Sequence, residues 1–219
     1  MPSSDPSTSP RLDTVVFDLG GVLIDWNPRH LYRRLFEDEA AMETFLREVC
    51  SPQWNERQDA GRPWHDAVAE LSALHPAHAP MIAAYHARWP EMLGGALDAT
   101  VAVLDELRGQ GVRLYALTNW SHETFPIARE RYPFLQWFEG VLVSGEERLV
   151  KPDPAIFALL CERYAIDPTR AVFIDDAPRN VHAAAATGMH ALQFRDAATL
   201  RQDLVALGLL PPRADTAAP

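Results

Sequence analysis

The chain has 219 residues, of which 47% are hydrophobic and 23% are charged, and its formal net charge at pH 7 is −10. A chain of this length buries roughly 70% of the surface it exposes when unfolded, so a core domain carrying a smaller inserted domain is stable without disulfides. The negative charge argues against a nucleic-acid-binding protein, because no basic stripe is available to neutralise the phosphates.

The two ends of the chain differ in composition from the rest. Residues 1–11 and 208–219 are rich in Pro, Ser, Ala and Asp, and we expect both to be disordered tails. The first residues carry no basic region and no apolar run, so they do not predict a secretory signal. No stretch approaches the roughly 18 consecutive apolar residues of a membrane-spanning helix. We therefore expect a cytoplasmic protein with no membrane partner, either a monomer or a homodimer.

Five short β-rich runs alternate with helical patterns along most of the chain. The runs cover residues 13–17, 112–117, 140–144, 171–175 and 190–194. The first, second and fourth are nearly continuous apolar runs, as is typical of parallel strands covered on both faces. Helical patterns follow over residues 98–109, 153–164 and 178–187. Strands that alternate with helices predict a doubly wound, Rossmann-like parallel sheet of the α/β class, built from residues 12–26 and 96–207.

The stretch from residue 27 to 95 interrupts this alternation, because it contains no convincing strand. It has at least three helical patterns instead: one runs from residue 27 to about 46, and others cover roughly residues 64–74 and 80–89. The first begins with Asn27 and Pro28, a good pair for the N-cap and the first helical position. We therefore expect an all-helical domain inserted after the first strand of the sheet.

Polar residues follow the carboxyl ends of the predicted strands, where parallel sheets bind ligands. Asp18 and Gly20 follow the first strand, Thr118 and Asn119 the second, Asp175 and Asp176 the fourth, and Lys151 lies in the loop after the third. Three carboxylates at one edge repel unless a cation neutralises them, and hard oxygen ligands suit Mg²⁺. Lys151 adds positive charge, and backbone N–H groups at helix starts bind anions. This set predicts phosphoryl transfer, in which catalysis is mostly positioning and charge neutralisation.

Four segments resemble the ordered motifs of the haloacid dehalogenase superfamily. They are FDLGGVL (17–23), LTN (117–119), the lysine of VKPDP (150–154) and IDDAPRN (174–180). Each motif is weak alone, but all four occur in order over about residues 13–205. The pattern looks most like the helical-cap subgroup that contains bacterial sugar-1-phosphate phosphatases and the N-terminal phosphatase domain of soluble epoxide hydrolases.

The resemblance implies a Mg²⁺-dependent phosphomonoester hydrolase that acts on a small phosphorylated metabolite, with a sugar phosphate as one candidate, through an aspartyl-phosphate intermediate. It implies that residues 27–95 form the family's cap domain. The implied metal ligands are Asp18, the backbone carbonyl of Gly20, Asp175 and Asp176. The implied catalytic residues are Asp18 as nucleophile, with Thr118, Asn119 and Lys151, of which the last three also bind the substrate. Asn180 is expected to brace the loop that carries the paired aspartates.

One position departs from the family pattern. Most phosphatases of the family carry a second aspartate two residues after the nucleophile as general acid and base, and this chain has Gly20 there. Because general acid–base catalysis contributes about 10²–10⁴-fold, we expect poor leaving groups to suffer most. His122, shortly after the second motif, is one candidate substitute. Asp25, Trp26 and Trp120 can line the mouth of the pocket, and Trp54 and Trp64 can reach it from the cap, although packing is the commoner use of tryptophan.

Two alternative functions stay open at this point. The metal-independent 2-haloacid dehalogenases also lack the second aspartate, but they lack the paired acids of the fourth motif, which this chain keeps as Asp175 and Asp176. A non-catalytic phosphate-binding protein of the same fold is the other alternative, with the missing acid marking lost activity.

Overall fold

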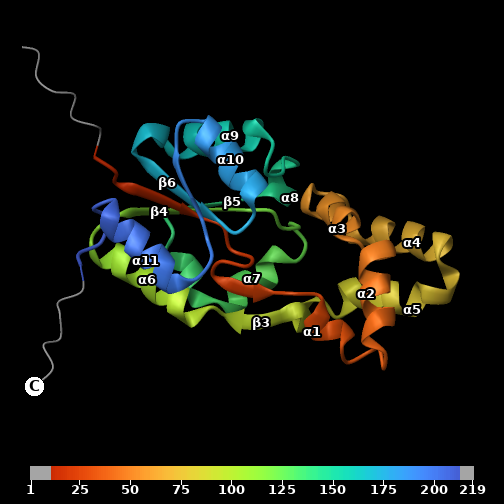
Figure 1. Ribbon diagram of the computed structural model, residues 1–219. Helices are drawn as coiled ribbons and strands as arrows, with labels where there is room; N and C mark the ends of the chain where they lie inside the picture. The colour runs from red at the N-terminus through yellow and green to blue at the C-terminus, as the bar shows by residue number, and fades with distance from the viewer. Residues whose placement is uncertain (1–10, 213–219) are drawn as a thin grey trace, which may run out of the picture.

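The computed structural model describes residues 11–212 and has a five-stranded, wholly parallel sheet at its centre. The strand order is β5-β4-β1-β6-β7, and the sheet lies between two layers of helices (Figure 1). The strands are β1 (Thr14–Phe17), β4 (Arg113–Thr118), β5 (Gly140–Val143), β6 (Ala171–Asp175) and β7 (His190–Gln193). All five predicted strands and the predicted α/β fold are confirmed. The chain leaves β1 toward β4 on one side and returns to β6 on the other, so the topological switch point lies at the carboxyl end of β1.

Helices cover both faces of this sheet, as the apolar strand runs require. One face packs against α6 (Asp98–Gly109), α7 (Phe125–Arg131) and α11 (Ala197–Ala206), and the other against α9 (Pro154–Tyr164) and α10 (Pro178–Ala186). In β1, Val15 and Phe17 belong to the first core and Val16 to the second. Short elements complete the domain: α8 (Ser144–Glu147), η3 (Pro133–Trp137) and η4 (Pro168–Arg170).

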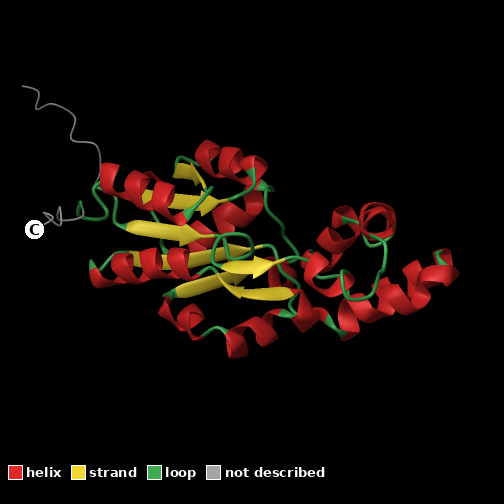
Figure 2. Cartoon of the chain, turned by 60° about the horizontal axis from the view of Figure 1, so that its bottom comes forward, coloured by secondary structure: helices red, strands yellow, loops and turns green. Residues whose placement is uncertain are grey.

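A second group of helices lies beyond the carboxyl ends of the parallel strands, whose arrowheads point toward it in Figure 2. It consists of α1 (Arg29–Tyr32), α2 (Glu39–Glu48), α3 (Pro52–Asp59), α4 (Trp64–Leu74), η1 (Pro76–His78), α5 (Ala79–Ala87) and η2 (Trp89–Met92). Its interior is aromatic: the rings of Tyr32 and Phe45 are 5.1 Å apart, and the ring of Trp54 is 5.5 Å from that of Trp64. We call this group the cap; its division from the core at residues 26/27 and 95/96 stays a prediction.

The predicted single helix over residues 27–46 is wrong. The chain leaves the helical path after α1 and starts α2 anew at Asp38, whose carboxylate caps the backbone N–H groups of Ala40 at 3.1 Å and Ala41 at 3.2 Å. A cap of this kind satisfies the free donors of a new helix start, so it favours two helices over one.

Three elements in and beside the cap, two strands and one helix, were not predicted at all. Strands β2 (Ile24–Trp26) and β3 (Leu93–Ala96) form a short antiparallel pair where the chain enters and leaves the cap, and β3 falls partly in the stretch predicted to be all-helical. Helix α3 was also missed, although Ser51 caps it through the Trp54 N–H at 3.2 Å and Pro52 occupies its first turn.

The predicted C-terminal tail starts too early, because Leu209 and Leu210 are buried against the core. Of the two predicted tails, residues 1–10 and 213–219 lie outside the described residues. Within residues 11–212, the helices are too short or too polar to cross a bilayer.

Candidate active site

Asp18 is the first residue after the central strand β1, and its side chain is buried at the switch point of the sheet. Its Oδ1 accepts a hydrogen bond from the Leu19 N–H at 2.7 Å and lies 2.9 Å from the Lys151 ammonium. Among the residues that the structure describes, all hydrogen bonds and ion pairs of this carboxylate fall on Oδ1. The other oxygen, Oδ2, is therefore available to a ligand or a reacting atom.

Lys151 is fully buried between two carboxylates. Its ammonium lies 2.9 Å from Asp18 and 2.7 Å from Asp175. Burial by itself lowers the pKa of a lysine, but the charges of Asp18 and Asp175 outweigh burial and raise the pKa of Lys151. The Asn119 side chain holds the lysine backbone in place, accepting from its N–H at 2.8 Å and donating to its carbonyl at 2.9 Å.

Asp175, the last residue of β6, is held from three directions and is fully buried. Its Oδ1 accepts from the Ala177 N–H at 2.9 Å, its Oδ2 accepts from Lys151, and the Asn180 amide lies 3.0 Å from both oxygens. These contacts agree with the expectation that Asn180 braces this loop.

The three predicted carboxylates form a cluster. Asp18, Asp175 and Asp176 each offer an oxygen within 4.8 Å of the others. Burial, followed by the charge of Asp175, raises the pKa of Asp176, and burial raises that of Asp18 to about 7 despite the nearby lysine. One ammonium does not neutralise three carboxylates, and clustered hard oxygens suit Mg²⁺. The donor set therefore fits a divalent cation.

Gly21 lets the chain pass close to this cluster. Its φ is +75°, and a Cβ added there would lie 2.7 Å from Oδ2 of Asp176. We expect Gly21→Ala to lower the free energy of unfolding by about 1–3 kcal/mol through backbone strain and to weaken Mg²⁺ binding by displacing Asp176. Denaturant unfolding and calorimetric Mg²⁺ titration measure the two effects. In the control Gly20→Ala, a Cβ meets no heavy atom within 4 Å, so we expect a smaller loss of stability. An equal loss in both variants would contradict the strain and the clash with Asp176 as its cause.

Core and cap residues line one cavity above the cluster. From the core come Asp18, Gly20, Asn119, Lys151, Asp176 and Asn180, and from the cap come Arg29, Asn55, Glu56, Asp59 and Tyr85. The structure thus brings together most of the predicted site. Thr118 does not line the cavity, because it is buried at the end of β4 opposite Val143, and its role in binding the transferred group stays a prediction. The exposed His122 does not line it either.

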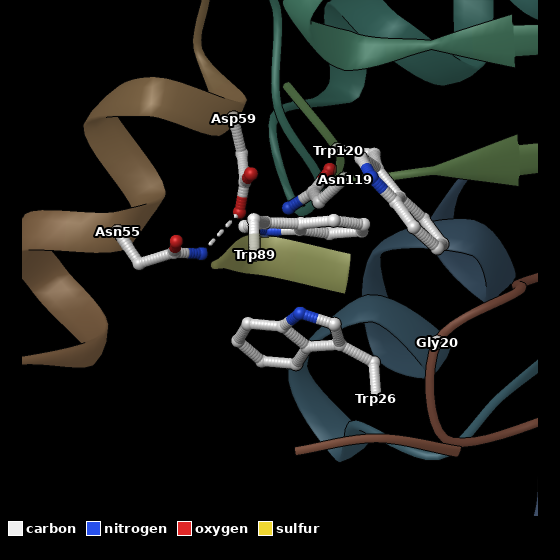
Figure 3. A pocket seen from close by; sticks show the side chains of 7 residues that line it. All are labelled: Gly20, Trp26, Asn55, Asp59, Trp89, Asn119 and Trp120. Atoms are coloured by element: carbon white, nitrogen blue, oxygen red, sulfur yellow. Dashed lines mark hydrogen bonds between the residues drawn. The ribbon is translucent and has the colours of Figure 1, made fainter. Parts of the chain in front are cut away.

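A smaller cavity adjoins the larger one and shares residues with it (Figure 3). Trp26, Trp89 and Trp120 form its apolar walls, and Asn55 and Asp59 of α3 form a polar end. Trp26 and Trp120 were expected near the pocket, but Asp25, Trp54 and Trp64, expected there too, line neither cavity. The two α3 residues were missed together with their helix. The only local signal for α3 was the Ser51-Pro52 pair that begins it.

Comparison with known proteins agrees with this geometry. A model of the family "haloacid dehalogenase-like hydrolase" matches residues 12–188. The sesquiterpene phosphatase astK of Aspergillus oryzae is 28% identical over 181 residues, which are 83% of this chain and 89% of that protein.

Two solved structures share the fold at low sequence identity. A haloacid dehalogenase family enzyme of Bacteroides thetaiotaomicron, crystallised with magnesium and inorganic phosphate, superimposes with a TM-score of 0.63 at 22% identity, covering 84% of this chain and 95% of that one. An L-2-haloacid dehalogenase superimposes with a TM-score of 0.67 at 21% identity, covering 90% and 100%. Because the family model spans most of the chain, this protein belongs to the haloacid dehalogenase-like hydrolase family and is an enzyme of its phosphatase type.

Proposed function

We propose that the protein is a Mg²⁺-dependent phosphomonoester hydrolase that works through an aspartyl-phosphate on Asp18. The observation that carries this proposal is the buried Asp18 carboxylate, which is fixed through Oδ1 by Lys151 and a backbone N–H while Oδ2 is left for attack. The acidic cluster beside it supports the metal.

The reaction has two displacements. In the first, a carboxylate oxygen of Asp18 attacks phosphorus, the bond from phosphorus to the leaving oxygen breaks, and the alcohol departs with a proton. In the second, water attacks phosphorus, the bond to Asp18 breaks, and inorganic phosphate leaves. Lys151 holds Asp18 in place and offsets charge on the phosphoryl group. Bound Mg²⁺, with Asp18, Gly20, Asp175 and Asp176 as the proposed ligands, would neutralise further phosphate charge.

The proposed substrate is a small phosphorylated metabolite bound between the core and the cap. A sugar phosphate is one candidate, and a terpenoid phosphate is another because of the fungal relative's name. Cytoplasmic location, a monomeric or dimeric state and the lack of nucleic acid or membrane partners stay predictions.

Metal-free dehalogenation is the rival activity on the same scaffold. The likeness to a dehalogenase structure at 21% identity shows the fold alone. The side-by-side Asp175 and Asp176 favour the phosphatase, because these charges next to Asp18 call for a cation.

Turnover with and without metal separates the candidates. We expect phosphate release from p-nitrophenyl phosphate and from a panel of sugar and terpenoid monophosphates, abolished by EDTA and restored by excess Mg²⁺. Chloride release from 2-chloropropionate in EDTA would establish the dehalogenase instead. Phosphate or Mg²⁺ binding with no turnover of any substrate would support the non-catalytic alternative.

A further inference from the structure

The cap supplies a carboxyl group to the cavity that is also lined by Gly20, the position where the family's acid is missing. Asp59 is the last residue of α3, and its side chain points into the small cavity that Gly20 and Asn119 also line (Figure 3). Among the described residues that line this cavity, Asp59 is the one carboxylic acid. It also lines the larger cavity that contains Asp18 and Lys151. Asp59 therefore faces the same space as the nucleophile while belonging to the opposite domain.

Contacts on both sides hold Asp59 in this place. Its Oδ2 accepts a hydrogen bond from the Asn55 amide, one helical turn earlier, at 2.9 Å. Its backbone carbonyl accepts from the Ser144 hydroxyl of the core at 2.6 Å, and Ser144 in turn accepts from the Trp120 N–H at 2.9 Å. The end of α3 is thus tied to the loop after β4. Because that loop also contains Asn119, the cap acid and the core site are positioned by one network.

The surroundings of Asp59 favour its neutral form. Burial is the main cause that raises its pKa to about 7, followed by the charge of Glu56 on its own helix, with a smaller contribution from Asp18. Tyr85 of α5, Arg29, Lys151 and Asp176 line the larger cavity with it, and burial together with the charge of Asp59 raises the pKa of Tyr85. A carboxyl group that titrates near neutral pH can both give and take a proton there.

We propose that Asp59 is the general acid and base of the reaction, supplied by the cap in place of the aspartate that Gly20 replaces. This inference rests on the proposed function. As the bond from phosphorus to the leaving oxygen breaks, Asp59 gives its proton to that oxygen and becomes a carboxylate. As water attacks the aspartyl-phosphate, Asp59 takes a proton from that water and returns to its starting state.

Because the acid belongs to the cap, protonation of the leaving group depends on closure of the cap over the core. The core keeps the nucleophile and metal ligands whether or not the cap is docked, but the acid is in place only when α3 lies against the loop after β4. With the cap open, the enzyme can bind the phosphate group of a substrate but cannot protonate its leaving group. Closure of the cap is then required for the bound substrate to react.

The test is a leaving-group series on wild type and Asp59→Asn. We expect kcat/KM for alkyl or sugar phosphates to fall about 10²-fold or more in the variant, with little change for activated aryl phosphates such as p-nitrophenyl phosphate. The dependence of rate on leaving-group pKa therefore becomes steeper. The donor must be protonated, so wild-type kcat/KM for alkyl phosphates falls as pH rises through about 7. That fall is absent from the variant.

Two further variants sharpen the result. Asp66→Asn makes the same change on the exposed surface of α4 and is expected to keep wild-type slope and pH profile. Gly20→Asp puts back the family's acid at a position where a Cβ meets no heavy atom within 4 Å. In the Asp59→Asn background it is expected to restore much of the turnover of alkyl phosphates. A merely structural role of Asp59 predicts no such rescue.

Wild type alone also tests the role of Asp59, even if the variants do not fold. The dependence of kcat/KM on leaving-group pKa is expected to be shallow at pH 6 and steep at pH 9. Equal slopes at the two pH values, or a variant with wild-type slope and pH profile, overturn the role of Asp59. Absence of phosphate release from every substrate, activated aryl phosphates included, overturns the proposed function itself.

Discussion

Replacing Asp18 with asparagine is expected to reduce phosphate release by roughly 10⁴-fold or more, the scale of loss when a covalent nucleophile is removed. The amide has nearly the same shape and can still accept from the Leu19 N–H, but it is a poor nucleophile toward phosphorus. Steady-state phosphate release measures the loss. Rapid acid quench followed by peptide mass spectrometry should find a phosphorylated peptide containing Asp18 in wild type and none in the variant.

The Asp18→Asn variant is expected to fold, because Lys151 keeps its ion pair with Asp175 at 2.7 Å. The raised pKa of Asp18 means that the folded state favours the protonated acid. The free energy of unfolding therefore falls as pH rises from 3.8, the ordinary pKa of an aspartate, to about 7, the pKa of Asp18 in the folded state. Urea unfolding without Mg²⁺ should show this decline in wild type and a smaller one in the variant. Substantial turnover by a folded Asp18→Asn protein would mean that water attacks the substrate directly.

The fold was predictable because its strands are buried on both faces. A run such as Thr14–Phe17 has all four residues buried, so its apolar residues are consecutive and stand out in the sequence. The site residues were predictable for a related reason. In a parallel sheet the strand ends converge, so Asp18, Asp175 and Lys151 meet although they are far apart along the chain.

The cap acid was not predictable in the same way. Helix α3 has the sequence PQWNERQD, in which only Trp54 is a large apolar residue, so no amphipathic pattern marks it. The placement of Asp59 depends on packing between domains, through Ser144 and Trp120. Such contacts leave no local signal. The break between α1 and α2 shows the same limit, because the apolar spacing continues across an interruption of the helix that the Asp38 cap makes favourable.

Removing the charge of Lys151 is expected to give the largest loss of stability in the core. In Lys151→Met the side chain keeps its approximate length, but Asp18 and Asp175 are left buried and unpaired. Breaking a buried ion pair from one side costs about 3–5 kcal/mol, and urea unfolding in Mg²⁺-free buffer at pH 8 measures it. The raised pKa of Lys151 keeps its contribution fully present below its ordinary value of 10.5, hence at all neutral pH values.

Magnesium should partly restore the Lys151→Met protein, because a divalent cation bound by the same acids replaces some of the missing positive charge. The Mg²⁺-induced gain in unfolding free energy is therefore expected to be larger in the variant than in wild type. Phosphate release stays low even so, since the ammonium group that holds Oδ1 of Asp18 is then missing. Arg47→Met, which breaks an exposed ion pair with Glu48 on α2, is the matched control and is expected to have a much smaller effect. An equally small loss of stability in both variants would mean that the ion pairs of Lys151 with Asp18 and Asp175 do not stabilise the core. It would also contradict the role of Lys151 in holding Asp18 in place.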